Sequence, residues 1–144
     1  MIGSGAFGAA TAYHLARRGV DVALLDQHAL GWQTSPRAAG LTSQADRVPV
    51  LARLRREACE AFERFEADMG RSIGYHRSGS LRAAYTDAGE ARVREGLATA
   101  QALGITAALV SPAEAERLAP HFRAGAPRAI LHVPDDGWLD PARL

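Results

Sequence analysis

The chain has 144 residues, of which 47% are hydrophobic, and a formal net charge of +1 at pH 7. This is the length of one ordinary domain and the composition of a globular protein. The small net charge comes without a basic tail or stripe, so nothing indicates a nucleic-acid partner. All 17 basic residues are arginine, which excludes a Walker-type phosphate lysine and a Schiff-base lysine.

Cysteine and histidine are sparse. Cys59 is the single cysteine, which excludes an internal disulfide and a cysteine-based metal site. The five histidines have no partners at metal-ligand spacing, so we predict no metal site. No stretch is apolar enough to span a bilayer, and the N-terminus lacks the basic and apolar regions of a signal peptide. We therefore expect a cytoplasmic location and no membrane span.

The first 26 residues predict a glycine-rich turn, a helix and a strand. Residues 3–8 read GSGAFG, and the helix is expected from Ala6 to Arg18, with Gly19 at its end. Residues 20–25 form a short apolar run with β-branched members, which predicts a buried parallel strand. The strand ends at Asp26.

A long loop and a long helix follow. Residues 27–45 have no clear period and are rich in small and turn-forming residues. Loops of this length in compact domains are usually functional. An amphipathic helix is expected from Asp46 to Met69, and Gly70 should end it. Its inward face is predicted to carry Leu51, Leu54, Ala58, Phe62, Phe65 and Met69.

The second half alternates strands with helices. Strands are expected at Ser78–Tyr85, Ile105–Val110 and Ala129–Val133, the last strand of the chain. Helices are expected at Thr86–Leu103 and from Ser111 until just before Pro120. For the second of these, Ser111-Pro112-Ala113-Glu114 forms a capping box with proline at the first helical position. A turn is expected at Pro134–Gly137, and Asp140-Pro141 resembles a further helix start.

The glycine-rich turn has the spacing of a dinucleotide fingerprint. Gly3 would make a tight turn, Gly5 would let a pyrophosphate approach the backbone, and Gly8 would let helix and strand pack closely. The helix N-terminus favours phosphate. Asp26 follows Gly5 by 21 positions and can accept hydrogen bonds from a ribose diol. The alternative is a plain strand-turn-helix with packing glycines. Only two residues precede Gly3, whereas strands usually run about 5–6 residues, so we expect the first strand to be incomplete.

The loop at residues 34–41, TSPRAAGL, combines small residues with one cation. Ala38, Ala39 and Gly40 would allow a flat ring or a phosphate to approach the backbone. Ser35 and Arg37 can donate hydrogen bonds to phosphate. The alternative is an ordinary surface loop, and the fingerprint alone does not separate NAD from FAD.

Several segments of the chain resemble a known protein family. The runs GSGAFGAATAYHLARRG, VALLDQ and TSPRAAGL resemble the N-terminus of the D-amino-acid oxidase/glycine oxidase superfamily of FAD-dependent oxidoreductases, which includes sarcosine and dimethylglycine dehydrogenases. SGSL at 78–81 and DGWLDP at 136–141 resemble, more loosely, the first substrate-domain strand and the return to the FAD domain.

The resemblance implies an incomplete α/β fold. Residues 1–72 would be the N-terminal part of an FAD-binding, Rossmann-like domain of the glutathione-reductase type. Residues 73–137 would begin an α+β substrate domain, and residues 138–144 would start the return to the FAD domain. On this basis we expect strand residues such as Leu81 and Ile130 to lack packing partners within the chain.

The resemblance also implies which residues contact FAD. Gly3, Gly5, Gly8 and Asp26 would bind its ADP half, and the loop would lie near the pyrophosphate or flavin. The candidate set is Gly3, Gly5, Ala6, Phe7, Gly8, Asp26, Gln27, Ser35, Arg37, Ala39, Gly40 and Leu41. Some relatives of the dimethylglycine type carry a histidine, covalently linked to the flavin, just before Ala-Ala-Gly. Arg37 stands there, so we expect FAD to bind non-covalently.

The implied activity is oxidation of a C–H bond beside the nitrogen of a small amine or amino acid. A hydride passes to flavin, and water hydrolyses the resulting imine. Family residues that grip the substrate carboxylate usually lie in later sequence, so no catalytic residue is assigned, and the electron acceptor stays unknown. Two alternatives remain open: a catalytically inactive product or bare nucleotide-binding module, and an NAD-dependent Rossmann enzyme.

Overall fold

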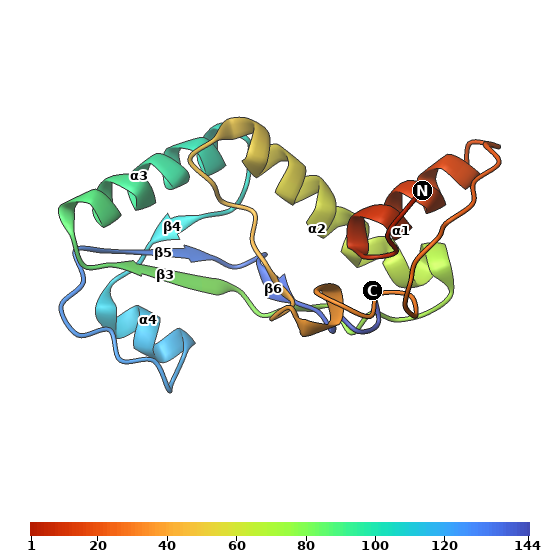
Figure 1. The fold of residues 1–144 in the computed structure, drawn as a ribbon. Coiled ribbons are helices and arrows are strands. Elements are labelled where there is room, and N and C mark those ends of the chain that lie inside the picture. Colours follow the sequence, from red (N-terminus) through yellow and green to blue (C-terminus); the bar gives the residue numbers. More distant parts are fainter.

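The computed structural model describes residues 1–144 and shows an elongated molecule (Figure 1). Helix α1 (Ala6–Ala16) lies at one end and a three-stranded sheet at the other. Helix α2 (Pro49–Met69) runs between these two parts. No helix in the structure has both the length and the apolar character that crossing a membrane requires.

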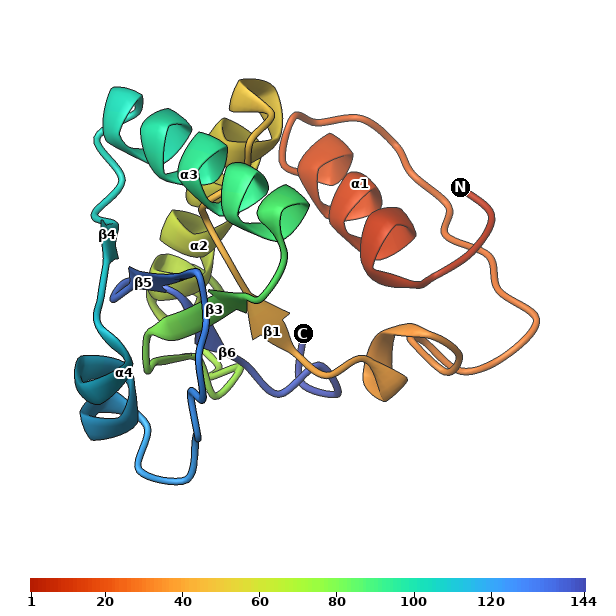
Figure 2. The ribbon, with the colours of Figure 1, turned by 90° about the vertical axis from the view of Figure 1, so that its left-hand side faces the viewer.

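The larger sheet consists of β3 (Ser80–Ala84), β5 (Ala129–Val133) and β4 (Ala108–Leu109), in that spatial order and antiparallel. Helices α3 (Asp87–Ala102) and α4 (Pro112–Leu118) cover its two faces (Figures 1 and 2). Because successive strand residues point to opposite faces, β5 contributes to two separate clusters of buried side chains.

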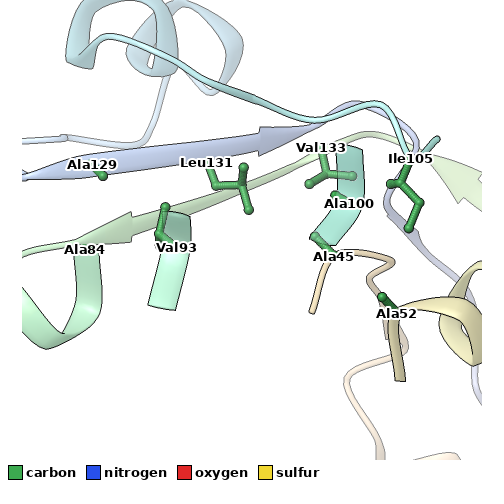
Figure 3. Packing of buried hydrophobic residues seen from close by; sticks show 9 residues of the cluster. All are labelled: Ala45, Ala52, Ala84, Val93, Ala100, Ile105, Ala129, Leu131 and Val133. Carbon is green, nitrogen blue, oxygen red and sulfur yellow. The ribbon is translucent and has the colours of Figure 1, made fainter. Parts of the chain in front are cut away.

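The main cluster joins this sheet to α3 and α2 (Figure 3). Its members are Ala45, Ala52, Ala84, Val93, Ala100, Ile105, Ala129, Leu131 and Val133. On the other face, Ile130 packs with Ala115 and Ala124, and Leu81 lies against them. The expectation that Leu81 and Ile130 would lack partners is therefore wrong, because α4 and the segment after it cover them.

A second sheet, not predicted, is built from β1 (Leu41–Thr42), β6 (Gly137–Trp138) and β2 (His76–Arg77), in that order and antiparallel. Each strand has only two residues, which is too short to show a hydrophobic period. Since β6 follows β5, Ala129–Val133 is not the last strand.

The glycine expected at the end of α2 is confirmed, and the capping box at Ser111 is confirmed in its first bond only, because the Glu114 carboxylate accepts hydrogen bonds from Arg117 instead. Thr86 Oγ1 accepts a hydrogen bond from Gly89 N at 3.1 Å, and Ser111 Oγ accepts one from Glu114 N at 3.1 Å. Gly70 follows α2 with a φ of 69° and Gly104 follows α3 with a φ of 71°. These left-handed conformations are the usual helix C-terminal arrangement for glycine.

The strand predicted at residues 20–25 is largely absent. The segment makes a single parallel bridge, between Leu25 and Ile2, flanked by the bonds Gly3 N to Leu25 O and Leu25 N to Met1 O. Leu25 is also 63% exposed, so the expected burial is wrong. A ladder needs a partner strand of comparable length, and only residues 1–3 are hydrogen-bonded beside this segment.

The predicted inward face of α2 is also wrong in part. Its buried residues are Ala52 and Cys59, Phe62 and Phe65 are half-buried, and Leu54 is 56% exposed. The stripe that packs is displaced by one residue from the leucines, which corresponds to about 100° around the helix. Periodicity locates an apolar stripe, but the neighbouring elements decide which residues are covered.

Two further segments differ from the structure predicted for them. The loop at residues 27–45 contains a short 3₁₀ turn, η1 (Ser35–Arg37), besides β1. The chain makes only a turn after Asp140, with Arg143 N bonded to Asp140 O at 3.0 Å. The helix expected to start at Asp140-Pro141 is therefore not present in the structure.

Candidate functional site

The glycine turn packs tightly against the start of α1. Gly3 has a φ of 93°, and a Cβ atom at Gly8 would collide with the carbonyl oxygen of Gly3. The close packing expected at Gly8 is thus confirmed. A Cβ at Gly5 would meet only Ser35 Oγ, at 3.5 Å, so the backbone at Gly5 is accessible to an approaching group.

The start of α1 offers backbone donors without protein partners. The N–H groups of Gly5 and Phe7 donate no hydrogen bond, and both residues are exposed. The first N–H groups of a helix lack intrahelical acceptors, and the helix dipole adds positive potential there. The turn therefore has the donor set that binds a phosphate.

The predicted loop meets this turn, although they are far apart in sequence. Ala6 N donates to Ser35 Oγ at 3.0 Å across 29 positions. Arg37 is exposed, and its Nη1 atom donates to Gln33 Oε1 at 3.4 Å. Ser35 thus occupies one helix donor itself, while the exposed guanidinium of Arg37 stays accessible. Ala39 is likewise exposed.

Asp26 is held by the turn. Its Oδ2 atom accepts hydrogen bonds from Ser4 N and Ser4 Oγ, each at 2.7 Å, and Oδ1 accepts one from His28 N at 2.9 Å. The Ser4 hydroxyl, followed by the His28 and Ser4 amides, lowers the pKa of this exposed carboxyl from 3.8 to about 2. A carboxylate has about four acceptor sites, so Asp26 keeps capacity for further donors. Its neighbour Gln27 is exposed.

Gly40 connects the loop to the smaller sheet. It has a φ of 68°, and a Cβ atom there would collide with the carbonyl oxygen of Leu139. Leu139 N donates to Gly40 O at 2.9 Å. The glycine is thus required by the approach of the Leu139 backbone, and contact between Gly40 and a flavin remains a prediction.

A row of exposed side chains crosses the smaller sheet. Leu41 pairs in register with Trp138, and Trp138 pairs with His76. Leu41 is 80% exposed and Trp138 is 44% exposed. The rings of His76 and Trp138 stack with centroids 4.4 Å apart.

The row lies on the face of the sheet that points away from α2. Arg77, which points opposite to His76, forms an ion pair with Glu63 of α2 at 3.1 Å. Sequence reasoning identified only Leu41, because the register that joins it to Trp138 and His76 exists only in the folded sheet.

Asp136 is the most deeply buried ionisable group. Its side chain is fully buried and accepts hydrogen bonds from Gln44 N at 2.7 Å and Ser80 Oγ at 2.6 Å. Burial, the largest effect, raises the pKa of this carboxyl above its usual value. Sequence reasoning assigned the residue to a turn, which is confirmed, but missed that its carboxylate joins three segments of the chain.

No group of three or more histidine, cysteine, aspartate or glutamate side chains lies close enough together to hold a metal ion. Cys59 is free and buried in α2. The groups that the candidate site presents to a ligand are backbone donors, the Asp26 carboxylate and the exposed row.

The comparisons with known proteins agree with one another. Residues 1–144 match the family described as FAD dependent oxidoreductase. Human dimethylglycine dehydrogenase, a mitochondrial protein, is 32% identical over 148 residues, which cover 100% of this chain and 17% of the relative. The chain thus spans about a sixth of the length of the curated relatives it matches.

Two solved structures extend the comparison. The glycine oxidase of Bacillus cereus is 25% identical with a TM-score of 0.77, and the match covers 99% of this chain and 40% of that one. The L-proline dehydrogenase of P. horikoshii has a TM-score of 0.89 at 22% identity and shows the shared fold, over 99% of this chain and 37% of that one.

Proposed function

The chain belongs to the family of FAD-dependent oxidoreductases, and from this we propose that it supplies the ADP-binding turn of an enzyme that oxidises the C–N bond of a small amine or amino acid. The observation that carries the proposal is the start of α1, where the free N–H groups of Gly5 and Phe7 lie beside the loop at residues 34–41. The family match favours FAD over NAD as the dinucleotide.

The residues present fit the ADP half of FAD. The free amides at Gly5 and Phe7, with the dipole of α1, would bind the pyrophosphate. Asp26, ionised at neutral pH and with spare acceptor capacity, would accept hydrogen bonds from the ribose hydroxyls. Gly3 and Gly8 would shape the turn, and Ala6, Gln27, Ser35 and Arg37 would surround the phosphates.

The flavin half would lie beyond Ala39 and Gly40, near Leu41. The exposed row of Leu41, Trp138 and His76 offers a mostly apolar surface next to that loop. Aromatic and aliphatic side chains suit the contact with a planar ring. This is the part of the chain where we place the ring.

Bound FAD would accept a hydride from the carbon beside the substrate nitrogen. The protein's part is to bind and orient the reactants and to exclude water. The printed names of the relatives, dimethylglycine dehydrogenase and glycine oxidase, suggest a small amino acid or N-methylated amine as the substrate. Substrate-binding residues and the electron acceptor stay unassigned, and we propose the cytoplasm as the location.

The mode of flavin attachment is directly testable. The protein for the test is the polypeptide encoded by the whole reading frame that contains residues 1–144, called the full-length protein below. We expect purified full-length protein to be yellow and acid precipitation to release all of the flavin into the supernatant, because Arg37 cannot form the covalent link. Flavin that stays in the pellet would contradict non-covalent binding.

The proposed reaction and the inactive alternative differ in turnover. The full-length protein should reduce an artificial electron acceptor when supplied with sarcosine, dimethylglycine or D-amino acids, and its flavin should bleach anaerobically with the right substrate. Flavin binding without bleaching by any amine would instead support a nucleotide-binding module. Absence of flavin altogether would overturn the proposal.

A further inference from the structure

Three arginines from separate segments line one hollow of about 510 Å³. Arg47 comes from the segment before α2, Arg82 from β3, and Arg92 from α3. They lie 35 and 10 positions apart in the sequence, so no basic run marks them. The folded chain therefore concentrates positive charge that its composition and sequence pattern do not reveal.

None of these three guanidinium groups has a protein partner. Arg47, Arg82 and Arg92 take part in no ion pair and donate no side-chain hydrogen bond. Seven other arginines do form ion pairs: Arg55, Arg56, Arg77, Arg94, Arg117, Arg128 and Arg143.

The acidic side chain in the lining and those in the adjoining first turn of α3 are paired with other arginines, and the buried Asp136, whose pKa burial raises and Arg82 helps to lower, forms no ion pair with Arg82. Asp46 is the single acidic residue in the lining, and it pairs with Arg55 at 2.9 Å. Asp87 and Glu90, in the first turn of α3, pair with Arg128 at 2.5 and 3.1 Å. The three free arginines therefore leave a net positive potential in the hollow.

The remaining walls are of two kinds. Thr86 and Gly89, at the N-terminal end of α3, contribute a helix end whose dipole is positive. Apolar and aromatic surface comes from Ala83, Ala84, Tyr85 and Val93. A ligand that matches all of this carries several negative groups on a short carbon or phosphate skeleton.

We propose that this hollow binds a small polyanion through carboxylate or phosphate groups held by Arg47, Arg82 and Arg92. Arginine is the side chain best suited to this task, because its planar fork donates two parallel hydrogen bonds to either group. The site shares no residue with the glycine turn or the Leu41–Trp138–His76 row, so it goes beyond the proposed function and does not depend on it.

The test is calorimetric titration of the full-length protein with citrate and, separately, with tripolyphosphate at low ionic strength. Arg82→Gln and Arg92→Gln are the site variants, and glutamine keeps most of the side-chain length without the charge. The matched control is Arg64→Gln, an exposed arginine of α2 that has no ion pair and lies outside the hollow. Thermal unfolding and flavin content are measured for every variant.

We expect at least one probe to bind the wild type and the Arg64→Gln variant equally, with an affinity that falls as salt is added. The probe that binds identifies carboxylate or phosphate as the preferred group. Each site variant should weaken binding about ten-fold or more, the effect of losing a hydrogen bond between charged groups. Unfolding temperature and flavin content should stay unchanged.

Absence of binding by the wild type to both probes would overturn the proposal. Equal weakening in Arg64→Gln and in the site variants would also overturn it, since the effect would then come from general charge. Loss of flavin in all samples with intact polyanion binding would count against the proposed function and leave this site standing.

Discussion

Two aspartates show how local environment decides what a carboxylate does. Asp26 is exposed and surrounded by donors, and the Ser4 hydroxyl is the main reason that its pKa falls to about 2. Asp136 is fully buried, and loss of solvation raises its pKa despite two hydrogen bonds. Asp26 therefore presents a charge at the surface, whereas Asp136 fixes the positions of Gln44 and Ser80.

Replacing Asp26 tests its predicted contact with ribose. We expect Asp26→Ala in the full-length protein to weaken FAD binding by about 10- to 100-fold, the range for a lost hydrogen bond to a charged group. Fluorescence quenching during titration of the apoprotein measures this. Ser4→Ala is the control, because it removes the hydroxyl bond to Asp26 but leaves the carboxylate. Equal weakening in both variants would assign Asp26 a structural role.

Replacing Asp136 tests the buried carboxylate. Because its pKa is raised above the ordinary 3.8, its contribution to stability is fully present below pH 3.8 and is lost as pH rises through the folded-state pKa. Asp136→Asn cannot ionise, so between pH 4 and 7 the wild type should lose stability relative to this variant. Urea unfolding across that range measures the difference, and parallel pH profiles would contradict it.

The alanine variant at the same position separates charge from hydrogen bonding. Asp136→Ala leaves the buried Gln44 N–H without its acceptor. We expect it to destabilise the full-length protein by about 1–3 kcal/mol, the cost of an unsatisfied buried polar group. A variant as stable as wild type at pH 7 would show that water or another group replaces the carboxylate.

At the scale of the elements, the accuracy of the sequence predictions follows the range of the interactions. Helix α4 was predicted to within a few residues because its cap, Ser111, acts within one turn. Helix α3, also predicted to within a few residues, is capped in the same local way by Thr86. The strand at residues 20–25 failed because a strand needs a partner, and β1, β2 and β6 went unpredicted because their residues become strands only through pairing.

The smaller sheet depends on a close approach at Gly137. A Cβ atom there would collide with the carbonyl oxygen of His76 on the neighbouring strand. We expect Gly137→Ala to destabilise the full-length protein by about 1–3 kcal/mol, as overpacking does. The control is Gly96→Ala in α3, where the nearest atoms lie at 3.9 and 4.0 Å. It should be neutral or stabilising because alanine favours helix, and an equal loss in both variants would contradict the assignment.

At the scale of the whole molecule, the candidate site divides into predicted and unpredicted parts. The glycine turn was predicted because the spacing of Gly3, Gly5 and Gly8 is itself the structural requirement. The hydrogen bond between Ala6 and Ser35 brings the predicted loop to this turn, and the contact of both with the phosphates of FAD remains a prediction. The exposed row of Leu41, Trp138 and His76 was not predicted, and neither was the hollow lined by three arginines. Each is assembled from segments that are distant in the sequence and come together only in the folded chain.

The chain by itself exposes more surface than a compact monomer of the same mass does. A compact monomer of this mass would expose about 7,100 Å², whereas residues 1–144 expose 9286 Å². Helix α1 has no buried residue, and Phe7 is 92% exposed. The exposed surface includes the glycine turn, Leu51 and Leu54 of α2, and the exposed row on the smaller sheet.

These observations lead to a prediction for residues 1–144 expressed alone. Burial of apolar surface contributes about 25 cal/mol per Å². Burying even part of the surface that is exposed beyond that of a compact monomer would therefore contribute stability comparable to the 5–15 kcal/mol of a whole domain. Without that contribution, α1 and the single bridge beside it should form and dissolve readily, and the donors of the turn would not be held in place for a phosphate. We therefore expect a poorly soluble chain without a sharp thermal transition, with weak or no FAD binding and no turnover.

The measurements are thermal unfolding with and without excess FAD, and an assay with sarcosine and D-amino acids. A cooperative transition that FAD raises, or flavin-dependent turnover, would show instead that these 144 residues are a functional unit.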